Sequence, residues 1–95
     1  MDSQVDARQR EVTIVNKRGL HARASARFVN AVAAMDGAQV TVSKDGVEAG
    51  GGSILGLMML GAGLGDSITI AVAGPEAEAN LAVLVELVET GFGET

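Results

Sequence analysis

The sequence predicts an α+β fold in which helices cover one face of an antiparallel β-sheet. The chain has 95 residues, a length that suits one domain. Several short segments alternate apolar with polar residues, as strands do when one face is buried and the other meets water. Segments with apolar residues at helical spacing lie between them, in the order β-α-β-β-α-β-α. This order favours a two-layer sandwich.

The first strand and the first helix occupy the N-terminal third of the chain. Residues 11–16 alternate and are rich in β-branched side chains, so we expect a strand there, followed by turn residues at 16–19. A helix is expected over residues 22–35, and the Asp-Gly pair at 36–37 ends it. The residues that recur at helical spacing are Ala22, Ala26, Val29 and Ala33.

The middle of the chain combines a hairpin with a short helix. Residues 39–43 and 47–49 have strand patterns, and the Asp-Gly pair within residues 44–46 is a hairpin signal. Three glycines at residues 50–52 then end the strand pattern. Ser53 is a natural N-cap for a helix over residues 54–60.

A strand and a helix complete the fold. Residues 67–72 alternate again, and residues 74–76 open a helix with proline where a missing N–H costs little. Gly91 ends this helix. Its apolar face is formed by Leu81, Leu84, Val85 and Val88, and its outer face carries Glu78, Glu86 and Glu89.

The composition excludes several classes of protein. Aromatic residues make up 2% of the chain, which argues against a platform that stacks nucleic-acid bases. The net charge of −5 argues against binding of a phosphate backbone, so we expect no nucleic-acid partner. The chain has no cysteine and one histidine, which excludes disulfides, and we expect neither a metal site nor a cofactor.

We expect a cytoplasmic protein with one domain. Residues 1–6 lack the basic and apolar regions of a signal peptide. The longest apolar stretch, residues 54–64, is shorter than the roughly 20 residues of a membrane span, so no membrane insertion is expected. The domain is expected over residues 11–92, with a flexible N-terminal extension at 1–10 and a C-terminal tail at 93–95.

Positive charge gathers around the only histidine. Six of the seven lysines and arginines lie between residues 8 and 27, although the chain as a whole is acidic. Local potential attracts an anion more than net charge does. This concentration favours an anion-binding surface near His21, and the alternative is an uneven scatter of charge in a short chain.

His21 stands directly before the first predicted helix. The N–H groups of Ala22, Arg23 and Ala24 lie in the first turn, where donors have no partner inside the helix and can hold a phosphate. A neutral imidazole is a nucleophile, and the guanidinium of Arg23 can reach the same anion when His21 is the N-cap. The alternative is a histidine that only caps the helix or packs in the core.

Two segments carry a resemblance to a known family. The segments GLHARAS at residues 19–25 and SILGLMMLG at residues 53–61 resemble motifs of the HPr/NPr family, the histidine-containing phosphocarriers of the bacterial phosphoenolpyruvate-dependent phosphotransferase system. The resemblance extends from residue 11 to residue 92. It implies an open-faced β-sandwich of four antiparallel strands with three helices on one face.

The resemblance also implies a function for this site. His21 would receive a phosphoryl group on Nδ1 from enzyme I and pass it to an enzyme II A component, while Arg23 stabilises the phosphate. Such a protein, important for sugar transport, is a stoichiometric carrier and not an enzyme. A carrier that exposes one helix start to several partners suits a monomer.

The sequence departs from the family pattern near the histidine. Ala24 stands where relatives commonly have proline, a change that preserves the helix and adds an N–H donor. Asn30 and Ala33 stand where family members often carry lysines. We expect Arg27 to compensate by steering acidic partners.

Ser53 has two interpretations. As the N-cap of the second helix it would contribute about 1 kcal/mol of stability. The resemblance implies instead a regulatory serine modified by HPr kinase/phosphorylase, whose phosphate would place up to about −2 charge beside surfaces that approach His21. Three glycines precede Ser53, where many relatives have a lysine and a polar residue.

The second helix carries many apolar residues. Leu57 and Leu60 have the spacing of core residues. Exposed apolar patches mark docking sites, and methionine suits several partners. Core filling is the alternative, which we favour slightly more for Met59 than for the other exposed candidates. The residues expected to form the docking patch are Ile54, Leu55 and Met58.

Two other functions compete with the phosphocarrier. One is a regulatory carrier of the nitrogen-related branch that binds partners through residues 54–59 according to its phosphorylation state. The Gly-Phe pair at residues 91–92 and the alanine-rich first helix are similar to that branch. The other is a generic α+β domain with a structural His21. A nucleotide-binding loop is rejected, because residues 50–53 lack the lysine of a P-loop and residues 61–65 lead into a strand.

Overall fold

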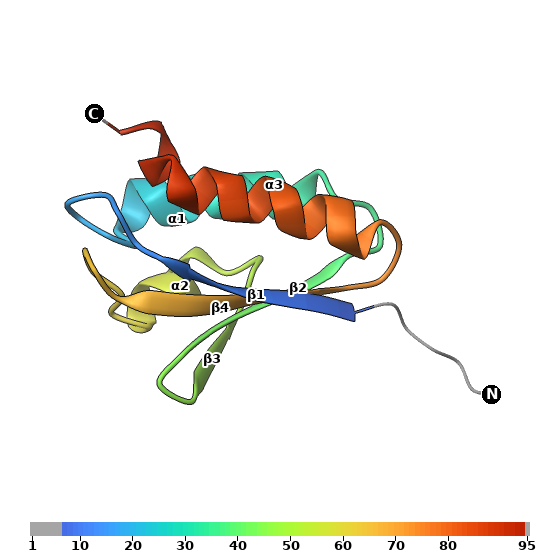
Figure 1. Ribbon diagram of the computed structural model, residues 1–95, viewed down its shortest axis with the longest axis horizontal. Coiled ribbons are helices and arrows are strands. Elements are labelled where there is room, and N and C mark those ends of the chain that lie inside the picture. The colour runs from blue at the N-terminus through green and yellow to red at the C-terminus, as the bar shows by residue number, and fades with distance from the viewer. Residues whose placement is uncertain (1–6, 95) are drawn as a thin grey trace.

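The computed structural model of this protein describes residues 7–94. It consists of one layer of strands and one layer of helices (Figure 1). The order of strands and α-helices is β-α-β-β-α-β-α, as the sequence predicts, and a short 3₁₀ helix follows. The elements are β1 (Ala7–Thr13), α1 (Ala22–Ala33), β2 (Gln39–Lys44), β3 (Val47–Gly50), α2 (Ile54–Met59), β4 (Ser67–Ala73), α3 (Ala77–Glu89) and η1 (Gly91–Gly93).

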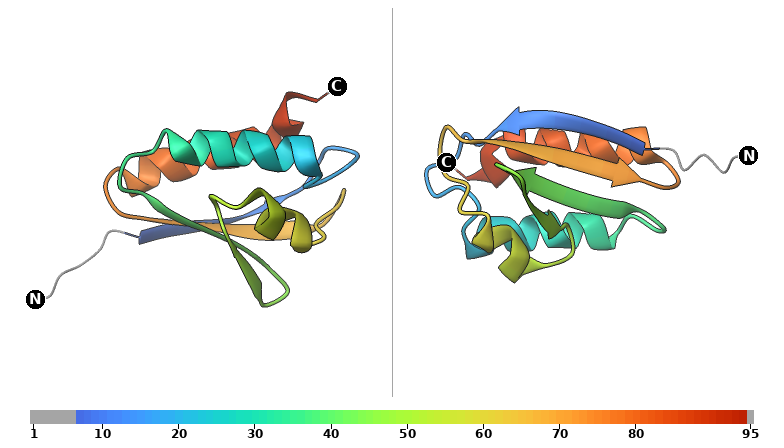
Figure 2. Two further views of the ribbon diagram at one scale, coloured as in Figure 1. Left: turned by 180° about the vertical axis from the view of Figure 1, so that it is seen from behind. Right: turned by 90° about the horizontal axis from the view of Figure 1, so that it is seen from below.

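The four strands form one antiparallel sheet in the order β1-β4-β2-β3. β2 and β3 form a hairpin, and β4 lies between β1 and β2. α1 and α3 run side by side over one face of the sheet, and Figure 2 shows the same layering from behind and from below. Within residues 7–94 no helix covers the opposite face. The predicted open-faced sandwich is confirmed.

The core fills the space between the sheet and the helices. Ile68, Ile70 and Val72 of β4 are buried, and the residues that alternate with them are more exposed. α1 contributes Phe28 to this core. α3 buries the apolar face that the sequence predicts, with Ala77 in addition, and its buried residues are Ala77, Leu81, Leu84, Val85 and Val88.

β1 begins earlier than predicted. Residues 7–10, expected in the N-terminal extension, belong to the strand because their backbone pairs with β4, starting with Ala7 opposite Ala73. β1 ends at Thr13, where its pairing with β4 stops. The domain therefore includes residues 7–10. The expected extension at residues 1–6 lies outside the described residues.

The buried face of α1 differs from the pattern of small residues that predicts the helix. α1 buries Ala24, Ser25 and Phe28, whereas Ala22 and Ala33 are exposed. An alanine offers little apolar area and a phenylalanine ring much more, so the ring determines which face packs on the sheet. The helix ends at Ala33, two residues before the predicted end.

The C-terminal segment returns to the beginning of α1. Phe92 lies in η1 with 1% of its surface exposed and a left-handed φ of 58°. Gly93 completes η1 and Glu94 is half-buried, so this part of the expected tail belongs to the fold. The ribbon views agree in placing the segment beside the start of α1 (Figures 1 and 2). Thr95 lies outside the described residues.

Candidate functional site

A tight loop before α1 fixes the position of the histidine. Gly19 has a left-handed φ of 60°, and a Cβ atom there would lie 2.2 Å from the Ala62 carbonyl oxygen. The Leu20 N–H donates to that same oxygen at 3.0 Å. The Asn16 side chain donates from Nδ2 to the Gly19 oxygen at 2.9 Å. Only glycine fits this close approach, which anchors the loop two residues before the N-cap of α1.

His21 is the N-cap of α1. Its backbone is extended, with φ −74° and ψ 179°, and its carbonyl accepts the first helical bond from Ser25 at 2.8 Å. Its Nδ1 accepts from the Arg23 N–H at 3.3 Å, which is long for such a bond, so the lone pair is only weakly engaged. The side chain is 21% exposed. His21 therefore caps the helix, as one alternative holds, and it does so from the surface and not from the core.

The first turn of α1 supplies backbone donors beside the ring. Ala22, Arg23 and Ala24 occupy the first three helical positions, whose N–H groups have no acceptor inside the helix. The side chain of Arg23 is exposed, whereas Ala24 is buried and presents only its backbone to the site. The helix dipole adds partial positive charge here. The three predicted phosphate-binding N–H groups thus lie in one turn directly after His21.

The nitrogen on the other side of the ring meets a carboxylate. Nε2 of His21 lies 2.5 Å from Oε2 of Glu94, and Oε1 of Glu94 accepts from Asn16 Nδ2 at 3.1 Å. The hydrogen bond with His21 lowers the pKa of the Glu94 carboxyl, burial opposes that shift, and the Asn16 bond adds to it. Sequence reasoning missed Glu94, because the partners are 73 positions apart and nothing in the spacing joins them.

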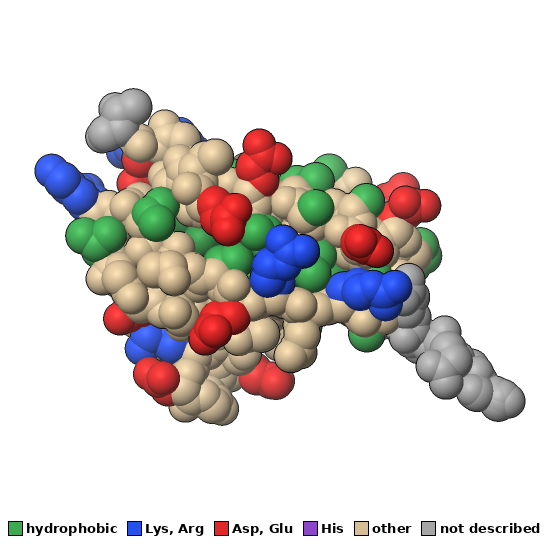
Figure 3. Space-filling view, viewed as in Figure 1, with side chains coloured by type: hydrophobic (Ala, Val, Ile, Leu, Met, Phe, Trp, Pro, Cys, Tyr) green, Lys and Arg blue, Asp and Glu red, His purple; other side chains and the backbone are tan. Residues whose placement is uncertain are grey.

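A basic cluster surrounds this pair. A surface hollow at the site is lined by Lys17, Arg18, His21, Arg23, Arg27, Gly93 and Glu94. On the face shown in Figure 3, in contrast, acidic and basic side chains are interspersed over α3 and the sheet. Arg27 donates from Nη1 to the Phe92 carbonyl oxygen, so this predicted docking residue also ties the C-terminal segment to α1. Four of the six basic residues between positions 8 and 27 therefore line this hollow, whereas Arg8 and Arg10 lie on β1, where Arg8 is 3.9 Å from Glu78 of α3.

Ser53 caps α2. Its hydroxyl accepts from the Gly56 N–H at 2.9 Å, and its backbone is extended. The residue is exposed. The interpretation as an N-cap is confirmed.

The apolar residues of α2 divide between core and surface. Leu57 is 0% exposed and Leu60 7%, as predicted. The predicted patch is exposed, at 40% for Ile54, 70% for Leu55 and 40% for Met58. The slight preference for a core position of Met59 is wrong. Met59 is 75% exposed, because it lies two positions from the buried Leu57 and therefore on the opposite side of the helix.

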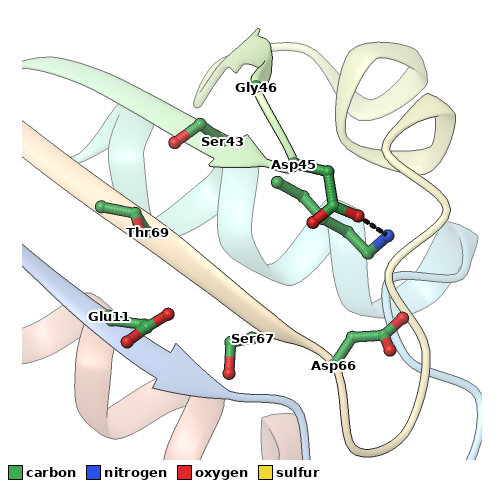
Figure 4. Close-up of a pocket in the computed structure, with 8 residues that line it drawn as sticks. Glu11, Ser43, Asp45, Gly46, Asp66, Ser67 and Thr69 are labelled. Carbon is green, nitrogen blue, oxygen red and sulfur yellow. Dashed lines mark hydrogen bonds and ion pairs between the residues drawn. The ribbon is translucent and has the colours of Figure 1, made fainter.

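A second hollow lies beside β4 and the β2–β3 turn (Figure 4). Its carboxylates come from three segments and point apart in the close-up. Lys44 bonds Asp45 at 3.1 Å, which raises the pKa of the lysine, and Asp66 accepts from the Gly63 N–H at 2.9 Å. The carboxylates of Asp45 and Asp66 are thus engaged locally and do not converge on a ligand.

Two features are absent from the part of the chain that the structure describes. No three histidine, cysteine, aspartate or glutamate side chains are grouped so that they could hold a metal ion. No helix is long and apolar enough to cross a membrane.

Comparison with known proteins identifies the class to which this fold and site belong. The family described as "PTS HPr component phosphorylation site" matches residues 8–90. The chain is 42% identical over 86 residues to the phosphocarrier protein HPr of Cupriavidus necator, covering 90% of this chain and 96% of the relative. It is 40% identical over 86 residues to the phosphocarrier protein NPr of Shewanella violacea, covering 90% and 93%.

Solved structures agree. HPr-C-His from Thermoanaerobacter tengcongensis superposes with a TM-score of 0.87 and 35% identity, over 93% of this chain and 98% of the other. HPr from Bacillus anthracis gives a TM-score of 0.81 and 36% identity, over 86% and 96%. The protein belongs to the HPr family of the phosphotransferase system, whose members are phosphocarriers.

Proposed function

We propose that the protein carries a phosphoryl group on Nδ1 of His21, receiving it from enzyme I and passing it to an enzyme II A component. The observation that supports this proposal is the position of the ring at the first turn of α1, with Nδ1 beside the Arg23 N–H. In this role the protein is a cytoplasmic, monomeric carrier. Each molecule is phosphorylated once and dephosphorylated once for every phosphoryl group that it transfers.

The geometry suits an in-line transfer. The Nδ1 lone pair attacks the phosphorus, and the bond from phosphorus to the donor breaks with its electron pair left on the donor. The phosphoryl oxygens then take the place of Nδ1 as acceptor for the Arg23 N–H, and the N–H groups of Ala22 and Ala24 lie in the same turn. The exposed guanidinium of Arg23 adds a mobile positive charge.

Labelling with phosphoenolpyruvate and purified enzyme I tests the proposal. We expect His21→Ala to abolish labelling and Arg23→Ala to slow it by about tenfold or more, with the circular dichroism spectrum unchanged. Arg10→Ala, which removes an exposed arginine from β1, is the matched control and should label normally. Labelling of His21→Ala at the wild-type rate would refute the proposal.

We further propose that Ser53 is a site for an HPr kinase/phosphorylase. Its exposure and its position before α2 support access for such an enzyme, and a phosphate at a helix start suits the dipole. Incubation with the kinase should add one phosphate by mass spectrometry, and Ser53→Ala should remain unmodified. A modified Ser53→Ala protein would place the phosphate elsewhere.

A regulatory carrier of the nitrogen-related branch is the second candidate. The exposed apolar side chains of α2 favour it, because they offer a docking surface for proteins beyond the transfer enzymes. Pull-downs with phosphorylated and unphosphorylated protein distinguish the two candidates. A regulatory carrier retains additional partners in only one of the two states, whereas a pure relay binds its two transfer enzymes alone.

A further inference from the structure

We propose that Glu94 is a positioning residue for the transfer, holding the proton of the His21 ring on Nε2 so that Nδ1 presents its lone pair. This inference rests on the proposed function and adds to it a residue from the opposite end of the chain. Its basis is the division of the ring's two nitrogens between two different partners.

The two hydrogen bonds of the ring define one tautomer. Nδ1 faces a backbone N–H donor at Arg23, so it must be the acceptor. Nε2 faces the Glu94 carboxylate at 2.5 Å, so it must be the donor. In the neutral ring, therefore, the proton is on Nε2 and the lone pair on Nδ1. A carboxylate that fixes the tautomer of a histidine in this way is a recurrent device in protein sites.

The surrounding structure holds the carboxylate in place. Asn16 donates from Nδ2 to both Gly19 and Glu94, and its Oδ1 is buried without a hydrogen-bond partner in the described structure. A buried acceptor without a partner lowers the stability of the fold. Here the orientation that leaves Oδ1 unpaired is the one in which the Nδ2 donors of the amide face Gly19 and Glu94. Arg27 binds the Phe92 carbonyl oxygen, two residues before the carboxylate. The loop before α1 and the end of the chain are thus joined at His21.

The charges that face the pair favour an ionised Glu94. The hollow is lined by four basic residues, Lys17, Arg18, Arg23 and Arg27. Among the described residues that line it, Glu94 is the one that carries a carboxylate. The carboxylate is on the Nε2 side of the ring, away from the nitrogen at which the phosphoryl group arrives. The carboxylate can therefore hydrogen-bond to the ring without occupying the position that the phosphoryl group takes at Nδ1.

The chemistry of transfer gives this contact a role in both directions. When Nδ1 forms its bond to phosphorus, the ring keeps its Nε2 proton and becomes an imidazolium. The Glu94 carboxylate then faces a full positive charge 2.5 Å away and stabilises it. In onward transfer the nitrogen–phosphorus bond breaks, its electrons return to Nδ1, and a neutral imidazole leaves. With its proton kept on Nε2 the ring leaves as a neutral imidazole and not as an imidazolate, which is a far poorer leaving group. Loss of the carboxylate that holds this proton therefore slows donation as well as acceptance.

Glu94→Gln tests the proposal, with Glu89→Gln as the matched control. Glu89 is an exposed carboxylate at the end of α3. We expect the ¹⁵N spectrum of wild-type His21 to show the Nε2–H tautomer at a pH where the ring is neutral. Glu94→Gln should show a mixture of tautomers and about a tenfold lower rate of phosphoryl transfer from enzyme I and to the acceptor. Glu89→Gln should match wild type in both measurements.

The outcomes separate this proposal from the proposed function. If wild type is phosphorylated on His21 but Glu94→Gln retains the tautomer and both rates, the positioning role is wrong and the carrier function stands. A faster Glu94→Gln would also overturn it, because the carboxylate would then be repelling the phosphoryl group. If wild type takes no phosphoryl group, the carrier function fails, whereas the tautomer measurement still reports on the contact.

Discussion

At the scale of single residues, the two nitrogens of His21 have opposite tasks. Nδ1 accepts a weak bond from the Arg23 N–H, and Nε2 lies against the Glu94 carboxylate. A ring held by only one of these contacts could rotate or exchange its proton. With both, its orientation and its tautomer are set before a partner arrives, which lowers the entropic part of the barrier.

The backbone of the first turn of α1 offers a direct prediction. On phosphorylation of His21 we expect the amide resonances of Ala22, Arg23 and Ala24 to shift strongly, because their N–H groups would gain a charged acceptor. Ala24 has an amide hydrogen to observe, where a proline would have none. The resonance of Asn80 in α3 serves as the control. An unchanged Ala24 amide would exclude this N–H from the phosphate site.

The Glu94 carboxyl gives a prediction about pH. Its pKa is lowered in the folded protein, chiefly by the hydrogen bond with His21. A carboxyl with a depressed pKa stabilises the fold above its ordinary pKa of about 4.3, and this contribution is lost as the pH falls through the lowered value. His21→Ala should raise the pKa of Glu94 toward its ordinary value in a ¹³C carboxyl titration. An unchanged titration in that variant would mean that the contact is absent in solution.

At the scale of the elements, the start of α1 depends on the loop before it. Gly19→Ala should destabilise the protein by about 2 kcal/mol or more, because the new Cβ would collide with the backbone of residues 62–63 and the left-handed φ would be strained. Chemical denaturation measures this loss. Gly46→Ala is the control for strain alone, since its φ is 84° and its Cβ would meet nothing. Equal losses in both variants would contradict the role of close approach at Gly19.

The elements also show what the sequence could predict. The alternation of apolar and polar residues predicted β4, and the spacing of apolar residues predicted α3 with its buried face. Both patterns are local, so they can be read from the sequence alone. The start of β1 at Ala7 could not be predicted, since residues 7–10 lack alternation and are strand only through pairing with β4. Likewise α1 turns inward the face of Phe28, which tertiary packing selects.

The site followed the same division. Position before a helix and local charge made His21, Arg23 and the first-turn donors candidates, and the resemblance to the HPr/NPr family favoured them over a purely structural histidine. Glu94 could not be predicted from the sequence, because its contact with His21 depends on how α3 and η1 bring the end of the chain back to α1. Met59 was misassigned because it lies two positions from Leu57, on the opposite side of the helix, so the two side chains cannot both face the core.

At the scale of the whole molecule, the surface offers partners two kinds of contact. The basic cluster around His21 suits acidic partner surfaces, and α2, which packs against α1, presents apolar side chains. Leu55→Ser should weaken transfer from enzyme I by about tenfold, the effect of about 1.4 kcal/mol of binding energy, with the melting temperature unchanged. Val83→Ser is the control, because Val83 is 51% exposed on α3. Equal effects of the two changes would show that α2 is no special docking surface.

One imidazole nitrogen, Nδ1 of His21, is the proposed carrier of the phosphoryl group. The most direct measurement is ³¹P and ¹⁵N nuclear magnetic resonance of the ¹⁵N-labelled protein after reaction with phosphoenolpyruvate and enzyme I. We predict one phosphorus per chain, coupled to Nδ1 of His21. Phosphorus on Nε2, or on any residue other than His21, would contradict the account.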